Sequence, residues 1–190
     1  MPNPIQFDDL GVINQALTGV MGENEITNLE DDQGKAALIM RKNYEAVSEA
    51  AQIKTAWRFN TSKVALNKLS GKPINRWAAA WQLPNDNLKV LTTWPPGNYE
   101  LQGNKLLSNN TASREIDYQR KIGEGLWPIW FTRYVVAMLV MRTVRGVTGE
   151  KPAQTMKDEL KDAESDALFQ DAQQQPNQTM LSNAFIDARF

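Results

Sequence analysis

Apolar residues recur at intervals of three and four in four stretches of the chain. In the first stretch Leu10, Ile13 and Leu17 fall on one side of a helix, and Asp8 and Asp9 are placed to begin it. The same spacing returns in three longer stretches, so the pattern predicts four helices. They are expected over about residues 8–21, 35–54, 128–147 and 152–174.

The third of these stretches is apolar on almost every side. Between residues 129 and 141 few polar side chains interrupt the run, which is typical of a helix that others enclose. Pro128 suits the first turn because its missing N–H is not needed there, and Gly149 marks the end. We therefore expect this helix at the centre of the fold.

The helical period disappears over about residues 61–125, where turn-forming residues accumulate. Two short apolar pieces, residues 99–101 and 105–108, flank Gln102-Gly103-Asn104, and a glycine-centred turn between such pieces predicts a β-hairpin. Residues 113–122 alternate partly between polar and apolar and are a candidate third strand.

Large apolar residues return after the last predicted helix. A glutamine-rich stretch at residues 170–178 precedes them, and five large apolar side chains in the last eleven residues favour an extended arm that docks on a partner over a frayed terminus. The expected contact residues of this arm are Met180, Leu181, Phe185, Ile186, Arg189 and Phe190.

These patterns predict a mainly α fold, with a bundle of about four helices beside a small β-rich hairpin or sheet region and an extended C-terminal arm. Residues 1–175 are expected to form a single domain, and residues 176–190 the arm. A chain of 190 residues can bury a core of this size without disulfides or a structural metal.

Composition excludes most familiar kinds of active site. The chain has no cysteine and no histidine, so thiol nucleophiles, imidazole bases and zinc sites built on sulfur or imidazole are absent. The sequence GEG at residues 123–125 leads into Trp-Pro and not into a phosphate-binding loop. We expect no cofactor, no metal and no catalytic residue.

Charge and hydropathy limit the kinds of partner that the chain is expected to bind. A net charge of -1 does not favour bulk attraction to DNA. The N-terminus lacks the pattern of a signal peptide, and the longest apolar run, residues 134–141, is far short of the roughly 20 residues that cross a bilayer. We expect a protein made in a reducing cytoplasm with no membrane partner.

Carboxylates offer the main alternative to a non-enzymatic role. The densest group is Glu23, Glu25, Glu30, Asp31 and Asp32. Two carboxylates across a cleft suffice for glycoside hydrolysis, but an acidic loop between helices is more often solvated surface, and the spacing lacks the pattern of a calcium-binding loop. Hydrolysis therefore stays the second hypothesis.

Six tryptophans are many for this length. Trp127 and Trp130 adjoin the all-apolar helix, so we interpret them as core residues. Trp77, Trp81 and Trp94 lie in the strand and loop region, where packing in a core and contact with a partner protein are equally good interpretations.

Acidic and basic residues are divided between the last two predicted helices. The last helix carries Asp158, Asp162 and Asp166 at intervals of four, and the helix before it carries Arg142 and Arg145. We predict that these residues meet between subunits; the alternative is that they neutralise each other within one chain.

The order of these elements resembles the head-to-tail adaptor proteins of tailed bacteriophages, the group that includes the tail tubular protein A of short-tailed phages. The resemblance rests on VINQALTGVMGENEITNLE at residues 12–30, WRF at 57–59, YELQGNKLLSN at 99–109, and the two helices YVVAMLVMRTVRGVTGEKPAQTMKDELKDAESDALFQDAQQQ at 134–175. The order and spacing of these stretches carry the likeness, since none contains a chemically unique residue.

The resemblance implies a structural, non-enzymatic role in the virion. Adaptor subunits assemble as a ring, commonly of twelve copies, between the portal protein and the tail protein of the nozzle or tail tube. The ring continues the channel through which genomic DNA passes, without sequence-specific binding. The expected location is the head–tail junction of the virion.

The resemblance also implies roles for two segments. The C-terminal arm would bind the portal, and the hairpin residues Tyr99, Gln102, Gly103 and Asn104 are expected to face the tail.

The second hypothesis for the function is a virion-associated peptidoglycan hydrolase that uses an Asp/Glu pair. A monomeric cytoplasmic binding module is the third.

Overall fold

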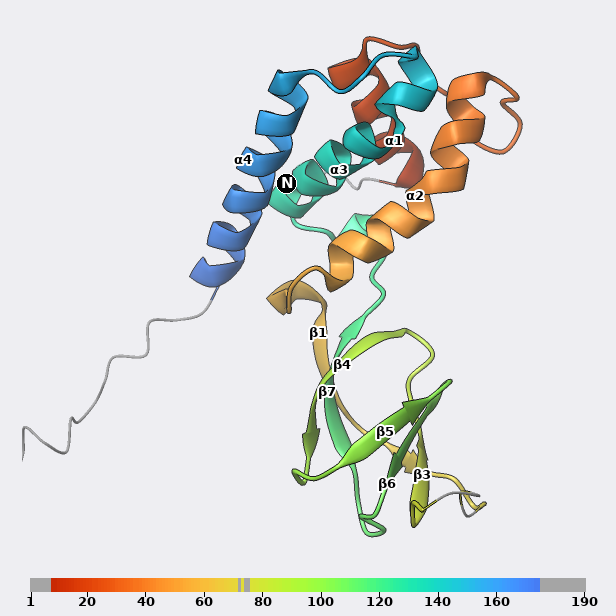
Figure 1. Cartoon of the computed structure of the whole chain (residues 1–190), viewed down its shortest axis with the longest axis vertical. Coiled ribbons are helices and arrows are strands. Elements are labelled where there is room, and N and C mark those ends of the chain that lie inside the picture. Colours follow the sequence, from red (N-terminus) through yellow and green to blue (C-terminus); the bar gives the residue numbers. More distant parts are fainter. Residues whose placement is uncertain (1–7, 72, 74–75, 175–190) are drawn as a thin grey trace, which may run out of the picture.

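The computed structural model describes residues 8–71, 73 and 76–174. Figure 1 shows an elongated molecule with its helices gathered at one end and its strands at the other. We call residues 8–60 and 121–174 the helical part and residues 61–120 the β part. The helices are α1 (Asp9–Ala16), α2 (Lys35–Ile53), α3 (Ile129–Thr148) and α4 (Gln154–Gln173), and a π-helical turn, η1 (Leu17–Met21), extends α1.

The four predicted helices are confirmed, but the mainly α class is wrong. Helices account for 48% of the chain and two small antiparallel sheets for 20%, so the fold is mixed α/β. The difference arises because the strands are only two to eight residues long. Such short strands give little periodic signal in a single sequence.

Helix α3 is the centre of the helical part, as its pattern predicts. Eleven of its residues are buried. Helices α1, α2 and α4 all pack against it. Its N-cap residue is Pro128, and it ends at Gly149, which takes the left-handed conformation with φ 83°.

An aromatic cluster fills the end of the helical core that adjoins the β part. Trp57 is fully buried, and its ring centroid lies 5.5 Å from Phe131 and 6.1 Å from Tyr134. Phe59 and Trp130 complete the group. The indole N–H of Trp57 donates to the Ala51 carbonyl at 2.7 Å, so this large side chain is buried without an unsatisfied donor.

The β part consists of two antiparallel sheets. The first, sheet A, has the order β1-β7-β4, and the second, sheet B, has the order β2-β3-β6-β5. The strands are β1 (Thr61–Ala65), β2 (Asn67–Lys68), β3 (Ala79–Gln82), β4 (Asn87–Trp94), β5 (Tyr99–Gln102), β6 (Lys105–Ser108) and β7 (Glu115–Arg120). Buried side chains of both sheets, including Trp81, Leu106 and Ile116, form one core between them.

The predicted hairpin is confirmed as β5 and β6, with Gly103 at φ 56° in its turn. The candidate third strand is confirmed as β7. It pairs with β1 and β4 and not with the hairpin, so it is the central strand of sheet A. Pairing with β1, which lies far earlier in the chain, could not be inferred from local pattern.

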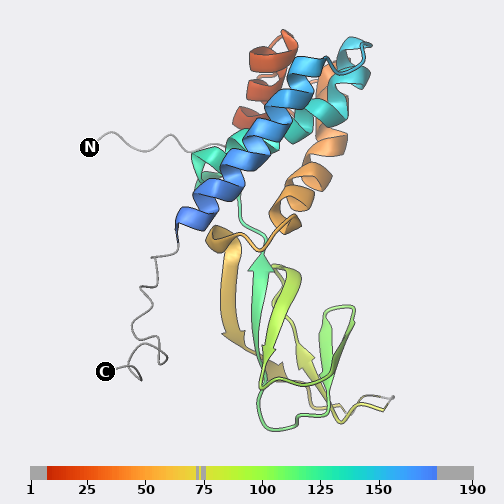
Figure 2. The same cartoon turned by 60° about the vertical axis from the view of Figure 1, so that its left-hand side comes forward.

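Two chain segments connect the helical part to the β part, and Figure 2 shows how narrow this junction is. Three buried amide side chains join the parts there: Gln52 of α2, Asn60, and Gln119 of β7. The Gln119 amide nitrogen lies 2.8 Å from the Gln52 carbonyl oxygen and also donates to the Thr55 carbonyl. The Gln52 side-chain oxygen accepts from the Ile122 N–H at 2.9 Å.

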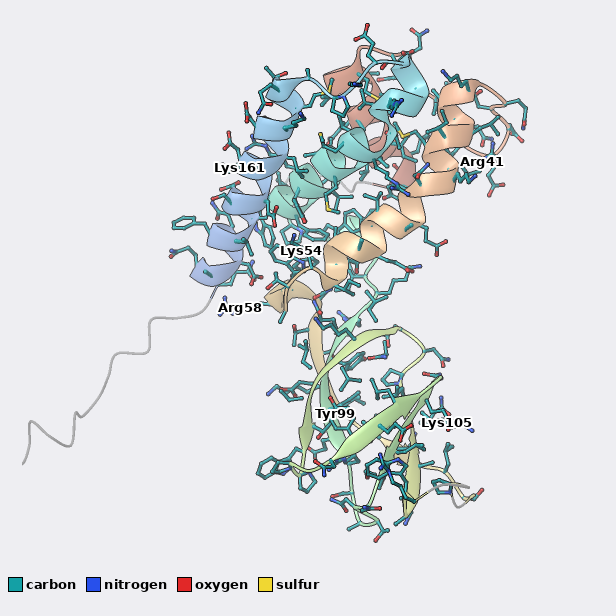
Figure 3. The ribbon with its side chains drawn as sticks, in the orientation of Figure 1. Arg41, Lys54, Arg58, Tyr99, Lys105 and Lys161 are labelled. Carbon is teal, nitrogen blue, oxygen red and sulfur yellow. The ribbon has the colours of Figure 1, made fainter. Side chains whose placement is uncertain are left out.

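Helix α4 is also tied to this junction. The backbone N–H of Arg58 donates to Asp171 Oδ1 at 2.8 Å, and the Arg58 guanidinium donates to the Asp171 carbonyl. Lys54 and Glu164 lie 3.1 Å apart nearby. Figure 3 labels Lys54 and Arg58 between the lower end of α4 and the first strand.

We predict that Gln119→Leu lowers the free energy of unfolding by about 1–3 kcal/mol. The substitution keeps the side chain close in size but removes the amide donor that the Gln52 and Thr55 carbonyls and the Asn60 side-chain oxygen share, so all three acceptors lose a hydrogen bond at the junction. Urea unfolding followed by circular dichroism measures the change. Gln15→Leu at an exposed position of α1 is the control; equal stability of the two variants would contradict the role assigned to the amides.

A second prediction concerns alkaline pH. Burial raises the pKa of Tyr134 from 10.0 to about 12. The folded state therefore holds this proton more tightly, and the resulting stability is complete below pH 10 and lost as the pH rises toward 12. Tyr134→Phe should make the unfolding free energy fall less steeply over this range. The exposed Tyr99→Phe serves as control, and identical slopes in all three proteins would contradict the prediction.

Candidate functional site

The two parts of the molecule differ in charge. Residues 61–120 contain eight Lys/Arg and four Asp/Glu, whereas the rest of the chain contains thirteen Lys/Arg and eighteen Asp/Glu. The β part is therefore basic and the remainder acidic, although the whole chain is close to neutral. Surfaces of opposite sign at the two ends of one molecule suit contacts with different partners.

A groove of about 480 Å³ opens on the helical part between α2, α3 and α4. In Figure 1, α3 runs between α2 and α4. Met138 and Met141 of α3 line the groove, together with Ala46 and Ala50 of α2 and Leu160 of α4. The two alanines are exposed. Apart from Arg142, which also lines it, the groove is an apolar surface open to solvent, and methionine side chains can adapt to the shape of a partner.

Sequence reasoning missed this groove. Ala46 and Ala50 follow the ordinary pattern of an exposed helix face, and nothing in their spacing distinguishes them. The groove arises because α2 and α4 both pack on α3 while small residues stand at its wall. An exposed i, i+4 pair of alanines beside a methionine-rich central helix is the signal that could have indicated it.

The predicted subunit-contact residues lie on two separate helices. Asp158 and Asp162 are exposed on α4, and Asp166 is half-buried. Arg142 and Arg145 are exposed on α3, and Arg142 donates to the Asn43 side chain of α2 at 3.3 Å. Within the described residues no ion pair joins these arginines to the three aspartates, so their meeting between subunits stays a prediction.

Neutralisation within one chain does occur at a neighbouring arginine. Arg133 of α3 and Glu159 of α4 are 2.8 Å apart, and this hydrogen bond raises the pKa of the Arg133 guanidinium. Asp162 and Asp166 add to the field at Arg133. Arg133 therefore pairs with α4 within the chain, whereas no such ion pair to α4 occurs at Arg142 or Arg145 among the described residues.

The hairpin residues proposed to face the tail are exposed. Tyr99 is 38% accessible and Leu101 47%, and they lie on the same side of the edge strand β5 because they are two residues apart. Gln102, Gly103 and Asn104 are exposed at the turn. In Figure 1 the arrow of β5 ends at the side of the β part, so the turn points sideways and not along the long axis. Figure 3 labels Tyr99 and Lys105 on this hairpin.

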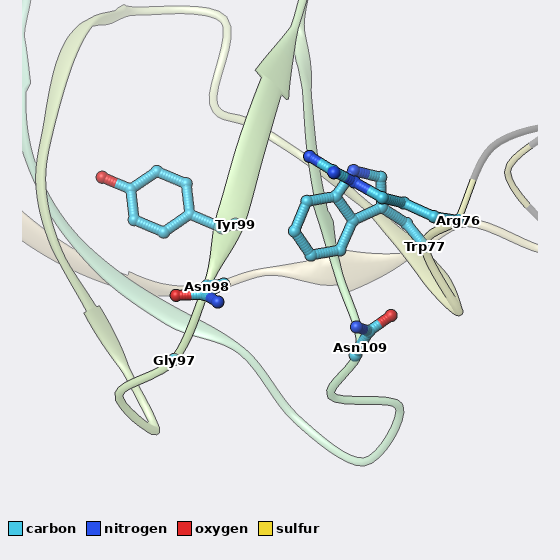
Figure 4. A pocket seen from close by; sticks show the side chains of 6 residues that line it. All are labelled: Arg76, Trp77, Gly97, Asn98, Tyr99 and Asn109. Atoms are coloured by element: carbon cyan, nitrogen blue, oxygen red, sulfur yellow. The ribbon is translucent and has the colours of Figure 1, made fainter.

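A pocket of about 580 Å³ lies beside the hairpin and is lined by both polar and aromatic residues. Figure 4 shows Arg76 stacked over the Trp77 ring, with Asn98 and Asn109 at the edge. The guanidinium carbon is 5.2 Å from the ring centroid, and the Trp77 N–H donates to Glu100 at 2.7 Å. These contacts already use the face and the donor of Trp77, which makes the residue part of the packing.

Five of the six tryptophans, including the fully buried Trp57, pack in a core, and one is exposed. Trp77 and Trp81 are 5% and 2% exposed, so their core interpretation is confirmed. Trp127 is buried, with its N–H donating to the Ile122 carbonyl, and Trp130 packs in the aromatic cluster. Trp94 is 65% exposed and therefore remains as a candidate contact residue.

A buried arginine in the β part was not anticipated. Arg114 is 2% exposed, and its guanidinium donates to the Pro95 and Gly97 carbonyls. Burial lowers the pKa of Arg114. The side chain fixes the segment between β4 and β5; an arginine just before a strand gives no sequence signal for such a role.

The acidic loop is organised by hydrogen bonds within the loop and to α2. Asp32 accepts from the Gly34 N–H at 2.6 Å, and Asp31 accepts from Asn28. Arg41, labelled in Figure 3, donates to the Glu30 and Asp32 carbonyls. Among the residues that the structure describes, no group of three potential metal ligands occurs. The cluster has the features of a structured surface loop.

Comparison with known proteins gives no assignment. No protein-family model matches the chain, and no curated protein matches it. In the described part of the chain, no helix is long and apolar enough to span a membrane. The contact residues predicted for the C-terminal arm, residues 180–190, lie outside the described residues.

We predict a coupling of less than about 1 kcal/mol between Arg133 and Glu159, because both side chains are about half exposed. A double-mutant cycle of Arg133→Ala and Glu159→Ala, measured by urea unfolding at low and high salt, gives this energy. The coupling should shrink as salt is added. A salt-independent coupling of several kcal/mol would contradict the surface character of this pair.

Proposed function

We propose that the protein is a non-enzymatic adaptor subunit of a tailed bacteriophage, which forms a ring between the capsid portal and the tail. The observation that carries the proposal is the separation of two unlike surfaces along one elongated chain. The acidic helical part bears the apolar groove, and the basic β part bears the exposed hairpin. A connector needs such surfaces because its ends meet different proteins.

The resemblance in the order of elements supports the same function. The first helix with its Gly-Glu turn, the WRF segment, the hairpin and the two last helices follow one another as in head-to-tail adaptors. In this proposal the C-terminal residues Met180, Leu181, Phe185, Ile186, Arg189 and Phe190 bind the portal. Asp158, Asp162 and Asp166 of one copy face Arg142 and Arg145 of the next.

A ring also needs lateral contacts that close on rotation. Such contacts are heterologous, so one face of the subunit must differ from the face that it meets. Among the described residues, Asp158, Asp162 and Asp166 of α4 form no ion pair with Arg142 or Arg145 of α3. Their availability is consistent with ring formation.

The decisive experiment is a mass measurement of the protein alone and mixed with purified portal protein. Native mass spectrometry should give a complex with one fixed number of subunits per portal ring, and removal of residues 176–190 should reduce that complex while circular dichroism stays unchanged. A protein that remains monomeric with portal present would overturn the proposal. Clearing of peptidoglycan in a gel, abolished by a single Asp or Glu substitution, would favour the hydrolase instead.

A substitution in the groove tests the helical surface. Ala50→Glu places a charge at the wall of the groove, where a partner would have to bury it. The substitution should weaken the association measured by native mass spectrometry at least tenfold. Because Ala50 is exposed on a helix, the unfolding free energy should change by no more than about 0.5 kcal/mol. Ala153→Glu, an exposed alanine at the start of α4, is the control; equal association of both variants would exclude the groove from the contact.

A further inference from the structure

Sheet A has an outer face that the adaptor role does not use. The strand register places Trp94 of β4 opposite Glu115 of β7, and Thr92 opposite Asp117. On the other side of β7, Lys63 of β1 is opposite Asp117. Since side chains alternate along a strand, these five residues share one face. They line a hollow of about 380 Å³.

The other face of the same sheet is the core of the β part. Val64 of β1, Ile116 of β7 and Tyr118 of β7 alternate with the outer residues, and Ile116 and Tyr118 are 1% and 6% exposed. The sheet thus fixes the backbone beneath the hollow, and the outer side chains project from a supported surface. A site built on strands is held more firmly than one on loops.

Trp94 is the unusual member of this face. Its side chain is 65% exposed, whereas the other tryptophans of the β part are buried. A large aromatic ring open to water in the middle of charged and hydroxyl-bearing neighbours has one apolar surface free for stacking. The register leaves Glu115 directly across from it, so a ligand lying on the ring would reach a carboxylate at its rim.

The charges of the hollow disfavour ions of either sign. Asp117 already has a cation 3.5 Å away in Lys63. A phosphate or other anion would face two carboxylates, and a cationic side chain would face the Lys63 ammonium. The set contains acceptors in Glu115 and Asp117, a donor in Lys63 and a hydroxyl in Thr92 that can do both. An uncharged ligand rich in hydroxyl groups satisfies all of them.

We propose that the outer face of sheet A binds a neutral polysaccharide. A pyranose ring has an apolar face of C–H groups, which stacks on the Trp94 indole, and a rim of hydroxyls, which donate to Glu115 and Asp117 and accept from Lys63 and Thr92. This site is independent of ring formation and goes beyond the adaptor role. It would bring the protein to a glycan surface without cutting it.

Binding without hydrolysis follows from the surroundings of the carboxylates. A glycosidase acid is kept protonated in an apolar pocket shielded from water. Glu115 is exposed, and Asp117 faces Lys63. The two residues therefore serve as hydrogen-bond acceptors for hydroxyl groups.

Affinity electrophoresis of the full chain through gels that contain soluble neutral glucans or glycol chitin tests the proposal. At least one polymer should retard the protein, and Trp94→Ala should remove at least 90% of the retardation. Trp94→Phe should retain most of it, because the ring remains. Leu126→Ala, at a 71% exposed apolar position of the helical part, is the matched control and should migrate as the unchanged protein.

Fluorescence supplies a second reading on the same proteins. Titration with a neutral hexasaccharide of N-acetylglucosamine or glucose, chosen from the retarding polymer, should shift Trp emission to shorter wavelength, and Trp94→Phe should abolish that shift while retaining affinity. Retardation by heparin or DNA but by no neutral polymer would overturn the proposal, as would unchanged retardation of Trp94→Ala. Release of reducing sugar that Glu115→Gln abolishes would replace binding by hydrolysis and also overturn it.

If Trp94→Ala blocks association with portal or between copies, and no neutral glycan binds, this face is a protein contact and the polysaccharide proposal fails. Loss of ring formation in every variant, with glycan retardation intact, would instead count against the adaptor role alone. The two proposals are therefore separable in one set of proteins.

Discussion

The buried amides at the junction determine how the two parts of this protein sit relative to each other. Gln119 lies on the central strand of sheet A, and its side chain reaches carbonyls at the end of α2. Hydrogen bonds are directional, so this contact fixes an angle, whereas an apolar contact of the same size could slide. The groove on the helices and the hollow on the sheet therefore keep a constant relation along the long axis, as the proposed connector role requires.

Local sequence pattern predicted the helices well and the fold class poorly, for one physical reason. A helix of about twenty residues repeats its apolar stripe five times, so Met40, Tyr44 and Val47 on α2 can be assigned to the buried side from spacing alone. A strand of four residues repeats its pattern twice. The hairpin was visible because Gly103 marks its turn, but the pairing of β1 with β7 joins residues about fifty positions apart and leaves no local trace.

The candidate surfaces also divide into those that a local sequence pattern predicts and those that depend on how the elements pack. The exposed hairpin was predicted because it is a local unit. The apolar groove was not, because it depends on how three helices pack and on the small size of Ala46 and Ala50. Trp94 illustrates the limit best: sequence left core and contact equally open for three tryptophans, and register and burial then separated Trp94 from Trp77 and Trp81. Side-chain identity alone contains no information about which face of a sheet is covered.

The hydrogen bonds between Arg58 and Asp171 have a mechanical consequence. These hydrogen bonds hold the last turn of α4 to the segment just before the β part through both the backbone N–H and the guanidinium of Arg58. Tension applied to the chain beyond Gln174 would therefore act at the junction and be transmitted to both parts together. Helix α4 would stay packed on α3 and would not peel away from it turn by turn. A load shared in this way is resisted by several hydrogen bonds strained at once, which withstand more force than bonds broken one after another.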